Sequence, residues 1–228
     1  MIEILAEQVT KRLGGKLALA GVSVAVPAGA LWGLVGADGA GKTTLLRCIA
    51  GLLRLDGGRV APGAAGQSRI GFAQQGFHLY SDLRVDENIQ FFGTVYGMTE
   101  RDLAARSEEL LSFAGLSDRR STFAGELSGG MKQKLTLVCS ILHRPPVLLL
   151  DEPTTGVDPL SRLEFWDLVE QLRSDGSTIL LASAYFDEVE RCDEVVYLSE
   201  GRVLAGGPPA RLRGDHASLE DAFLALTA

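Results

Sequence analysis

The order of hydrophobic and polar positions predicts short strands at the start of the chain, followed by a buried strand and a helix. Over the first 30 residues apolar and polar positions alternate, as at Val22, Val24 and Val26, which is typical of half-buried strands. The compact apolar run over 30–35 ends in glycines and predicts a buried strand. Apolar residues at helical spacing over 43–53 predict the helix that follows it.

Strands and helices continue to alternate in the rest of the chain. Residues 99–115 predict a helix that Thr99 caps, with Asp102 at the third position. Its buried stripe is expected to comprise Leu103, Leu110, Leu111 and Ala114. After a helix that Pro145-Pro146 breaks, the pattern predicts strands over 147–150, 179–182 and 194–198, a helix over 163–173, and a terminal helix capped by Ser218 with Asp221. This alternation favours an α/β fold with a mainly parallel sheet covered on both faces.

Composition limits the class of protein. The 228 residues are 46% hydrophobic and 22% charged, which fits one large globular α/β domain. The net charge of −7 and the lack of a Lys/Arg run argue against nucleic acid as a partner. Cys48, Cys139 and Cys192 lack disulfide or metal-ligand spacing and predict reduced thiols in a cytosolic compartment. No apolar run nears the roughly 18–20 residues that cross a bilayer, and the N-terminus is unlike a signal peptide, so a membrane link is expected only through a partner.

A glycine-rich segment between the first buried strand and its helix matches the phosphate-binding pattern G-x-x-x-x-G-K-[ST]. Backbone N–H groups of such a loop surround phosphate oxygens, and the helix N-terminus adds partial positive charge. Lys42 is expected to reach the β- and γ-phosphates, and the Thr43 hydroxyl to ligate Mg²⁺. A simple glycine-rich turn is the alternative, but it explains neither the strand context nor the Lys and Thr. The predicted nucleotide-binding residues are Gly36, Ala37, Asp38, Gly39, Ala40, Gly41, Lys42, Thr43 and Thr44.

Two acids follow the apolar strand over 147–150. They stand at its carboxyl end, where open α/β sheets bind their ligands. Asp151 is expected to hold Mg²⁺ through water, and Glu152 to polarise the attacking water as a general base. Two acids after a strand more often form a helix cap or a solvated edge. Beside a phosphate loop, they predict the second half of a nucleotide site.

The segment LSGGMKQKL at 127–135 narrows the family. With GADGAGKTT before it and LLLDEPTTGVDP after it, the chain resembles the ATP-binding cassette (ABC) family over essentially its whole length, with the motifs in that family's order and spacing. The resemblance implies a P-loop NTPase (RecA-like) fold, in which an antiparallel N-terminal β part and an inserted α-helical subdomain join the parallel core. It also implies a single nucleotide-binding domain, with its catalytic core at 1–75 and 140–228 and the helical subdomain at 76–139.

The resemblance assigns further site residues. Gln75 aligns with the Q-loop glutamine that contacts Mg²⁺ and signals to the membrane partner, although Gln74 is an adjacent alternative. Asp158 matches the D-loop aspartate that reaches across the dimer interface. Ser128, Gly129 and Gly130 match the family segment that contacts the γ-phosphate of the ATP bound to the opposite subunit. ATP is therefore expected to join two cassettes. Without the resemblance, Asp158 would be interpreted as a turn residue before Pro159, and Ser128 with its glycines as an ordinary helix N-cap.

The chain departs from the family pattern at three positions. Ala184 stands where the family has a switch histidine, and it lacks the donor that would stabilise charge on the γ-phosphate. Turnover is therefore expected to be reduced, while ATP binding is expected to persist. Leu13 stands where the family stacks the base on an aromatic ring, which predicts weaker base selectivity. Asp38 stands where the family often has Asn.

Several functions remain open on these residues. The leading prediction is the ATP-hydrolysing subunit of an exporter resembling the ABC-2 type. Its expected partners are permease subunits and a second, identical or different, ABC subunit, which would place it on the cytoplasmic face of the cell membrane. A regulatory or weakly hydrolysing cassette of an asymmetric pair is the alternative that Ala184 keeps open. A cassette ATPase acting on DNA or ribosomes is disfavoured, because the 86 positions from Lys42 to Ser128 leave no room for a long coiled coil.

An aromatic-rich stretch is the candidate surface for a membrane partner. Six of the fifteen aromatic residues lie between 72 and 96, where the family forms the groove for a coupling helix of the transmembrane subunit. Most of them are expected to be subdomain core. Phe77, His78 and Tyr80, just beyond Gln75, are the expected groove contacts.

Overall fold

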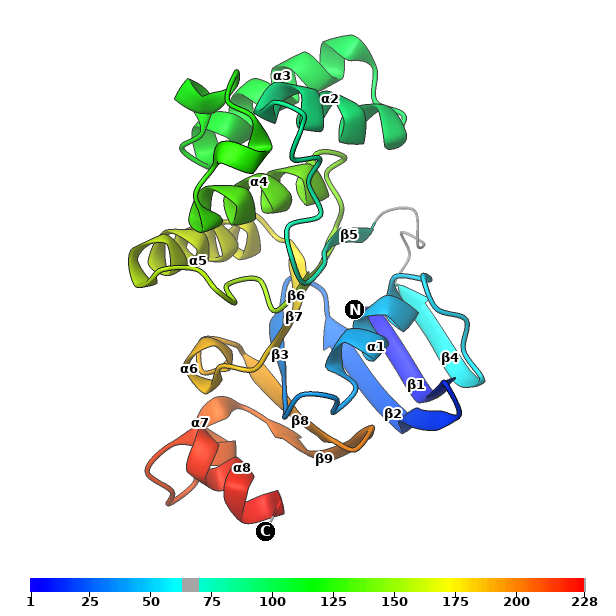
Figure 1. The fold of residues 1–228 in the computed structure, drawn as a ribbon. Helices are drawn as coiled ribbons and strands as arrows, with labels where there is room; N and C mark the ends of the chain where they lie inside the picture. Colours follow the sequence, from blue (N-terminus) through cyan, green and yellow to red (C-terminus); the bar gives the residue numbers. More distant parts are fainter. Residues whose placement is uncertain (63–69, 228) are drawn as a thin grey trace.

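The computed structural model describes residues 1–62 and 70–227 and has a six-stranded sheet at its centre (Figure 1). The strand order is β5-β6-β7-β3-β8-β9. The strands are β3 (Leu31–Val35), β5 (Ile70–Ala73), β6 (Val147–Asp151), β7 (Thr178–Ser183), β8 (Glu194–Ser199) and β9 (Arg202–Gly207). All neighbours pair in parallel except β8 and β9. The predicted mainly parallel sheet is confirmed.

A second, antiparallel sheet is formed by the N-terminal part, in the order β2-β1-β4. Its strands are β1 (Ile2–Leu13), β2 (Lys16–Pro27) and β4 (Gly57–Pro62). The prediction of short strands was wrong here, because β1 and β2 run for 12 residues each. Register shifts interrupt their pairing, one of them between Ala6 and Val9, where Gln8 has φ +48°. These irregularities break the alternation of apolar and polar residues, so the sequence pattern looks like several shorter strands.

The two sheets enclose one core and the helices cover a second. Helix α1 (Lys42–Ile49) contributes Leu45, Leu46 and Ile49 to the core shared with the antiparallel sheet. In β6, Leu149 joins that core, whereas Leu148 and Leu150 join the core on the opposite face. The side chains of β6 thus alternate between two buried faces, which explains its uninterrupted apolar sequence.

A group of helices lies at one end of the molecule, at the top of Figure 1. It contains α2 (Val85–Val95), α3 (Glu100–Phe113), the short 3₁₀ helices η2 (Ser117–Arg119) and η3 (Ala124–Glu126), and α4 (Gly129–Ile141). The Asp102 N–H donates to Thr99 Oγ1 over 3.2 Å at the start of α3, as the sequence predicts. The expected stripe of Leu103, Leu110, Leu111 and Ala114 is buried.

The rest of the chain covers the remaining sheet face and the lower end of the molecule in Figure 1. Its helices are α5 (Pro159–Ser174), α6 (Phe186–Val189), α7 (Pro209–Arg213) and α8 (Leu219–Thr227). Helix α5 begins four residues before the predicted start, because Asp158 caps it and Pro159 opens it. The Asp221 N–H donates to Ser218 Oγ over 3.0 Å at the predicted terminal helix. Within the described residues, no helix combines the length and the apolar character that a membrane span requires.

Candidate functional site

The phosphate-loop segment joins β3 to α1 and is held between the two sheets. A Cβ placed on Gly36 would lie 2.1 Å from Leu198 O, so only glycine fits against β8. Gly41 has φ +111°, and a Cβ there would lie 2.7 Å from Ala18 O in β2. Gly41 is also the N-cap of α1, and no side chain caps the helix. Its first N–H groups are therefore free of a side-chain cap, which is the arrangement that binds phosphate.

Lys42 folds back over this loop. The side chain is only 4% exposed, and its ammonium group donates to Gly36 O over 2.7 Å and to Ala37 O over 3.3 Å. Its Nζ also lies 3.8 Å from Glu152 Oε1. One buried cation thus lies between the loop backbone and the second acid of the strand-end pair.

Thr43, in the first turn of α1, contacts Asp151 at the end of β6. The Thr43 hydroxyl donates to Asp151 Oδ1 over 2.9 Å. Asp151 is fully buried, and its Oδ2 has no hydrogen-bond partner among the residues that the structure describes. Burial raises the pKa of Asp151, and the negative charge of Glu152 acts in the same direction, whereas the Thr43 hydrogen bond opposes it. A hydroxyl beside a buried carboxylate oxygen that lacks a donor is a set of oxygen ligands that suits a hard cation such as Mg²⁺.

Glu152 lies at the mouth of the site in an unusual backbone conformation. Its φ is +48°, and its N–H donates to Ala182 O in β7 over 2.8 Å. Gln75 Nε2 donates to Glu152 Oε2 over 2.8 Å, and the Thr155 hydroxyl lies 3.5 Å from the same oxygen. The His78 ring contacts Gln75 O at 2.9 Å. Gln75, and not Gln74, is therefore the glutamine that reaches the acidic pair.

The parallel strands bring these residues together. Ala73 pairs with Leu150, Asp151 with Ala182, and Val35 with Ser183, so the carboxyl ends of β5, β6, β7 and β3 lie at one edge. A cavity of about 440 Å³ opens there. It is lined by Asp38, Gly39, Ala40, Gly41, Lys42, Thr43, Thr44, Gln75, Glu152 and Thr155. Thr155 was not among the residues predicted from the sequence, although its position three residues after Glu152 in a turn was a usable signal.

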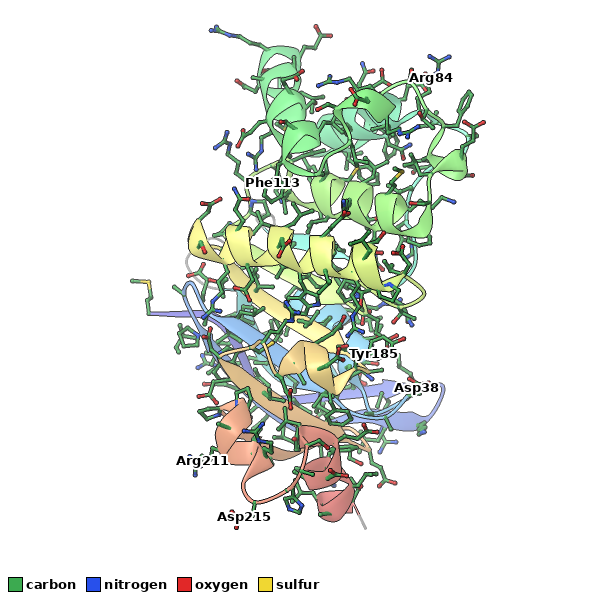
Figure 2. All side chains as sticks on the ribbon, turned by 90° about the vertical axis from the view of Figure 1, so that its left-hand side faces the viewer. Asp38, Arg84, Phe113, Tyr185, Arg211 and Asp215 are labelled. Carbon is green, nitrogen blue, oxygen red and sulfur yellow. The ribbon has the colours of Figure 1, made fainter. Side chains whose placement is uncertain are left out.

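A second cavity of about 670 Å³ adjoins the first and shares Asp38, Gly39 and Ala40 with it. Its other walls are residues of β2 and of the β8–β9 turn, among them Lys16 and Arg202. In Figure 2, Asp38 lies at the edge of the molecule. Leu13 is 43% exposed and is absent from the lining of both cavities. In this structure Leu13 therefore makes no part of the phosphate cavity.

The four predicted dimer-contact residues lie at the starts of α4 and α5, two helices that pack on each other. Ser128 Oγ accepts a hydrogen bond from Met131 N over 3.3 Å at the start of α4, and Asp158 Oδ1 accepts one from Ser161 N over 3.0 Å at the start of α5. The bonds from Ser161 lower the pKa of Asp158. A Cβ on Gly130 would lie 2.3 Å from Ser161, whereas Gly129 meets nothing closer than 3.6 Å. Among the described residues, none of these four lines the phosphate cavity.

The position expected for a switch histidine directly follows β7. Ala184 is exposed there, beyond the buried Ser183. The Tyr185 N–H donates to Ser183 Oγ over 2.9 Å, so the chain turns immediately into α6. The backbone at residue 184 is thus held by its neighbours and not by its own side chain.

A third cavity, of about 250 Å³, lies between the sheet and the helices and includes part of the aromatic stretch. It is lined by Ala50, Leu52, Ile70, Phe72, Gln74, His78, Leu79, Phe92, Tyr96, Thr136, Cys139 and Ser140. Of the three expected groove contacts, His78 lines it. Phe77 and Tyr80 are exposed outside this lining, where Phe77 faces the Lys132 ammonium at 5.9 Å and Tyr80 packs on Phe91 at 4.5 Å.

Comparisons with known proteins agree with this arrangement. The ABC transporter family model matches residues 19–155. The chain is 42% identical over 212 residues to the probable multidrug ABC transporter ATP-binding protein YbhF of Escherichia coli K12, covering 89% of this chain and 37% of that relative. It is 41% identical over 213 residues to the Nod factor export ATP-binding protein I of Burkholderia lata, covering 90% and 70%. A solved structure of an ATP binding subunit of an ABC transporter aligns over 100% of both chains, at 28% identity and a TM-score of 0.88.

Proposed function

Because the chain belongs to the ABC transporter family, we propose that it binds MgATP and hydrolyses it to power a membrane exporter. One observation carries the proposal. Lys42, Thr43, Gln75 and Glu152 line one cavity, and Asp151 lies directly behind Thr43. These are the groups that phosphoryl transfer to water needs: a cradle for phosphates, oxygen ligands for a metal, and a general base.

Each group has a part in the proposed reaction. The N–H groups of the loop and of the first turn of α1 would hold the phosphate chain, with the Lys42 ammonium against its terminal part. Thr43, Asp151 and Gln75 would hold Mg²⁺, which neutralises charge that develops on the phosphate oxygens. Glu152 would take the proton of the attacking water. Before that step, the hydrogen bond from Gln75 holds the Glu152 carboxylate at the mouth of the cavity.

The site is proposed to be completed by a second cassette. Ser128 and Gly129 are outside the lining of the phosphate cavity of their own chain, and a Cβ on Gly129 would make only ordinary contacts, at 3.6 Å with Gly156 O and 3.9 Å with Phe77 Cζ. In a dimer these N–H groups would face the nucleotide of the partner cassette, and Asp158 would contact its partner across the interface. The second cassette can be identical or different.

A permease is the proposed partner at the groove of about 250 Å³ between α2 and the sheet. The groove is apolar at Phe72, Leu79 and Phe92, and Gln74 and His78 connect it to Gln75. An amphipathic segment of a membrane subunit fits such a surface. This places the chain on the cytoplasmic face of the cell membrane, bound through the permease. We further propose 76–139 as the helical subdomain that carries this groove, and 1–75 with 140–228 as the catalytic core.

The chain spans 37% of the length of the E. coli relative and 70% of the Burkholderia relative, so the activity of the complete transporter is itself part of the proposal. Those two relatives are described as a multidrug transporter protein and a Nod factor exporter protein. Such names agree with export as the direction. The two relatives are named for different cargoes. We propose that membrane subunits select the cargo of this chain's transporter.

One observation favours a second function. Ala184 offers no donor to a terminal phosphate, and loss of one such donor costs roughly 10²–10³ in kcat in other enzymes. A weakly hydrolysing or regulatory cassette of an asymmetric pair is therefore the alternative. The complete set of Lys42, Gln75 and Glu152 favours turnover over a silent site.

Phosphate release at saturating MgATP, measured over a range of protein concentrations, tests the proposal, with Glu152→Gln as the matched control. We expect a rate that rises faster than linearly with protein and disappears in the control. Ala184→His is expected to raise the rate, because residue 184 is exposed and a larger side chain is accommodated. MgATP binding without release above the Glu152→Gln background would refute autonomous turnover and support the regulatory alternative.

A further inference from the structure

Glu188, in α6, is a buried carboxylate outside the phosphate cavity. Its side chain is 1% exposed. Oε1 accepts hydrogen bonds from Thr154 Oγ1, from Arg162 Nε over 3.0 Å and from Trp166 Nε1 over 3.4 Å. Oε2 accepts one from Ser183 Oγ over 2.5 Å. Four donors thus converge on a single buried carboxylate in α6, a helix of one turn.

The donors come from three segments that border the site. Thr154 lies two residues after Glu152, in the turn that follows β6. Ser183 ends β7, directly before Ala184. Arg162 and Trp166 lie on α5, whose N-cap is Asp158. Glu188 therefore ties together the segments that carry the proposed base, the switch position and the proposed dimer contact.

The turn after β6 needs such an anchor. Glu152 has φ +48°, a conformation that a non-glycine residue keeps only when its surroundings impose it. On the β7 side, the backbone is fixed by the bond from Glu152 N to Ala182 O. On the other side, the first buried polar contact after Glu152 is that of Thr154 with Glu188.

A second layer of contacts holds Glu188 itself. The Arg162 guanidinium forms hydrogen bonds of 2.8 and 2.7 Å to both oxygens of Asp187 and lies 4.8 Å from the centre of the Tyr185 ring. Figure 2 labels Tyr185 near the start of α6. Ser183 Oγ also accepts the Tyr185 N–H. The segment 183–188 is thus closed around Arg162 without any contribution from the side chain of residue 184.

We propose that Glu188 is a positioning residue for hydrolysis, which acts on Glu152 through Thr154 and holds the backbone at residue 184 through Ser183. The inference rests on the proposed function, since it concerns the general base of that reaction. Glu188 touches neither the phosphate loop nor the cavity lining, so it sets the rate of the chemical step and leaves nucleotide affinity unchanged. Displacement of a reacting group by about 1 Å can cost roughly 10²-fold in rate.

The variants are Glu188→Gln, Thr154→Val and Thr154→Ser, with Asp193→Asn as control. Asp193 also accepts hydrogen bonds from an arginine, Arg173, and from the Leu31 N–H, but it lies at the other end of β3. We expect Glu188→Gln and Thr154→Val to lower kcat at least ten-fold per folded molecule, with KM for MgATP changed less than two-fold. Thr154→Ser restores the hydroxyl and should keep most of the parent kcat. Asp193→Asn should leave kcat unchanged.

Folded protein is quantified for every variant by near-ultraviolet circular dichroism and urea unfolding. A parent-like kcat in folded Glu188→Gln and Thr154→Val, or kcat and nucleotide affinity falling together, would overturn the positioning role. If Glu188→Gln does not fold, the Val and Ser variants of Thr154 decide by the same criteria. If the parent releases no phosphate above Glu152→Gln, the proposed turnover fails and this inference fails with it. If the parent hydrolyses ATP and the variants do so at the same rate, this inference is refuted and the proposed function stands.

Discussion

Gly130 and Gly129, neighbours at the start of α4, should respond in opposite ways to the same added methyl group. A Cβ on Gly130 would lie 2.3 Å from both Cβ and Oγ of Ser161 in the first turn of α5. Ser161 has little freedom to withdraw, because its N–H is bonded to Asp158 Oδ1. A Cβ on Gly129 would lie 3.6 Å from Gly156 O and 3.9 Å from Phe77 Cζ, which are both ordinary contacts.

The magnitude follows from two opposing effects. Overpacking of a tight contact costs about 1–3 kcal/mol, whereas replacing a helical glycine by alanine gains about 0.5–1 kcal/mol. An overlap at 2.3 Å is severe, so the cost should lie in the upper part of its range, and Gly130→Ala should lower the free energy of unfolding by about 1–2 kcal/mol. For a chain of this size that corresponds to a Tm lower by roughly 2–8 °C. Gly129→Ala should change the free energy of unfolding by about 0 to +1 kcal/mol.

Urea unfolding followed by circular dichroism measures both variants, and a double-mutant cycle identifies the cause. Ser161→Gly removes both atoms that the new methyl group would strike, so Gly130→Ala combined with Ser161→Gly should recover about 1–2 kcal/mol relative to the sum of the single changes. Additive effects, or equal losses for the two alanine variants, would refute the close packing of α4 on α5 as the reason for glycine at position 130.

Three further predictions concern the nucleotide, the metal and acid stability. Leu13→Tyr supplies the aromatic face that this position lacks and should tighten MgATP binding about two- to ten-fold, measured by titration with a fluorescent nucleotide. Asp151→Asn removes a buried, incompletely paired charge, so the Tm measured in EDTA should stay equal or rise. The variant should also lose the additional rise in Tm that Mg²⁺ causes when ATP is present. A rise that is retained would contradict Asp151 as a Mg²⁺ ligand. The backbone N–H of Arg12 donates to the Asp56 carboxylate over 2.6 Å and lowers the pKa of Asp56. The stability that this hydrogen bond contributes is therefore present above the unfolded-state pKa of about 3.9 and is lost as the pH falls through the lower folded-state pKa. Asp56→Asn should accordingly lower the Tm at pH 7, and its difference from the parent should shrink below about pH 4.

Elements with local signals were predictable, and those without them were not. Helix α3 was predicted to within one residue at its start, because Thr99 and Asp102 form a local cap and its apolar residues recur at helical spacing. Helix α2 was missed. Its N-cap is Arg84, which is not a usual capping residue, although Glu87 accepts the Arg84 N–H over 2.7 Å. Its aromatic residues gave no clear helical stripe.

The site shows the same limit at a longer range. The predicted phosphate loop and acidic pair are linear motifs, so Lys42, Thr43 and Asp151 could be predicted as site residues from spacing alone. Gln75 reaches Glu152 because β5 pairs with β6, a contact that the sequence did not predict, and Gln75 itself was singled out by family resemblance and not by the residue pattern. Glu188 was not singled out, since a glutamate in an acidic stretch looks like a solvated residue until Arg162, Thr154 and Ser183 are seen around it.

The conformation of Glu152 explains why the chemistry proposed at this position should depend on distant residues. A φ of +48° costs a non-glycine residue about 1–3 kcal/mol, and the contacts of the Glu152 carboxylate with Gln75 and Lys42 hold the side chain and not this backbone angle. The compensating contacts belong to the neighbours: Ala182 O accepts the Glu152 N–H, and Thr154 is bonded to Glu188. A neutral replacement of Glu152 therefore inherits the same backbone, because the strain is held by β7 and α6. A residue that acts on Glu152 need not touch the nucleotide, and its loss changes the rate before it changes binding.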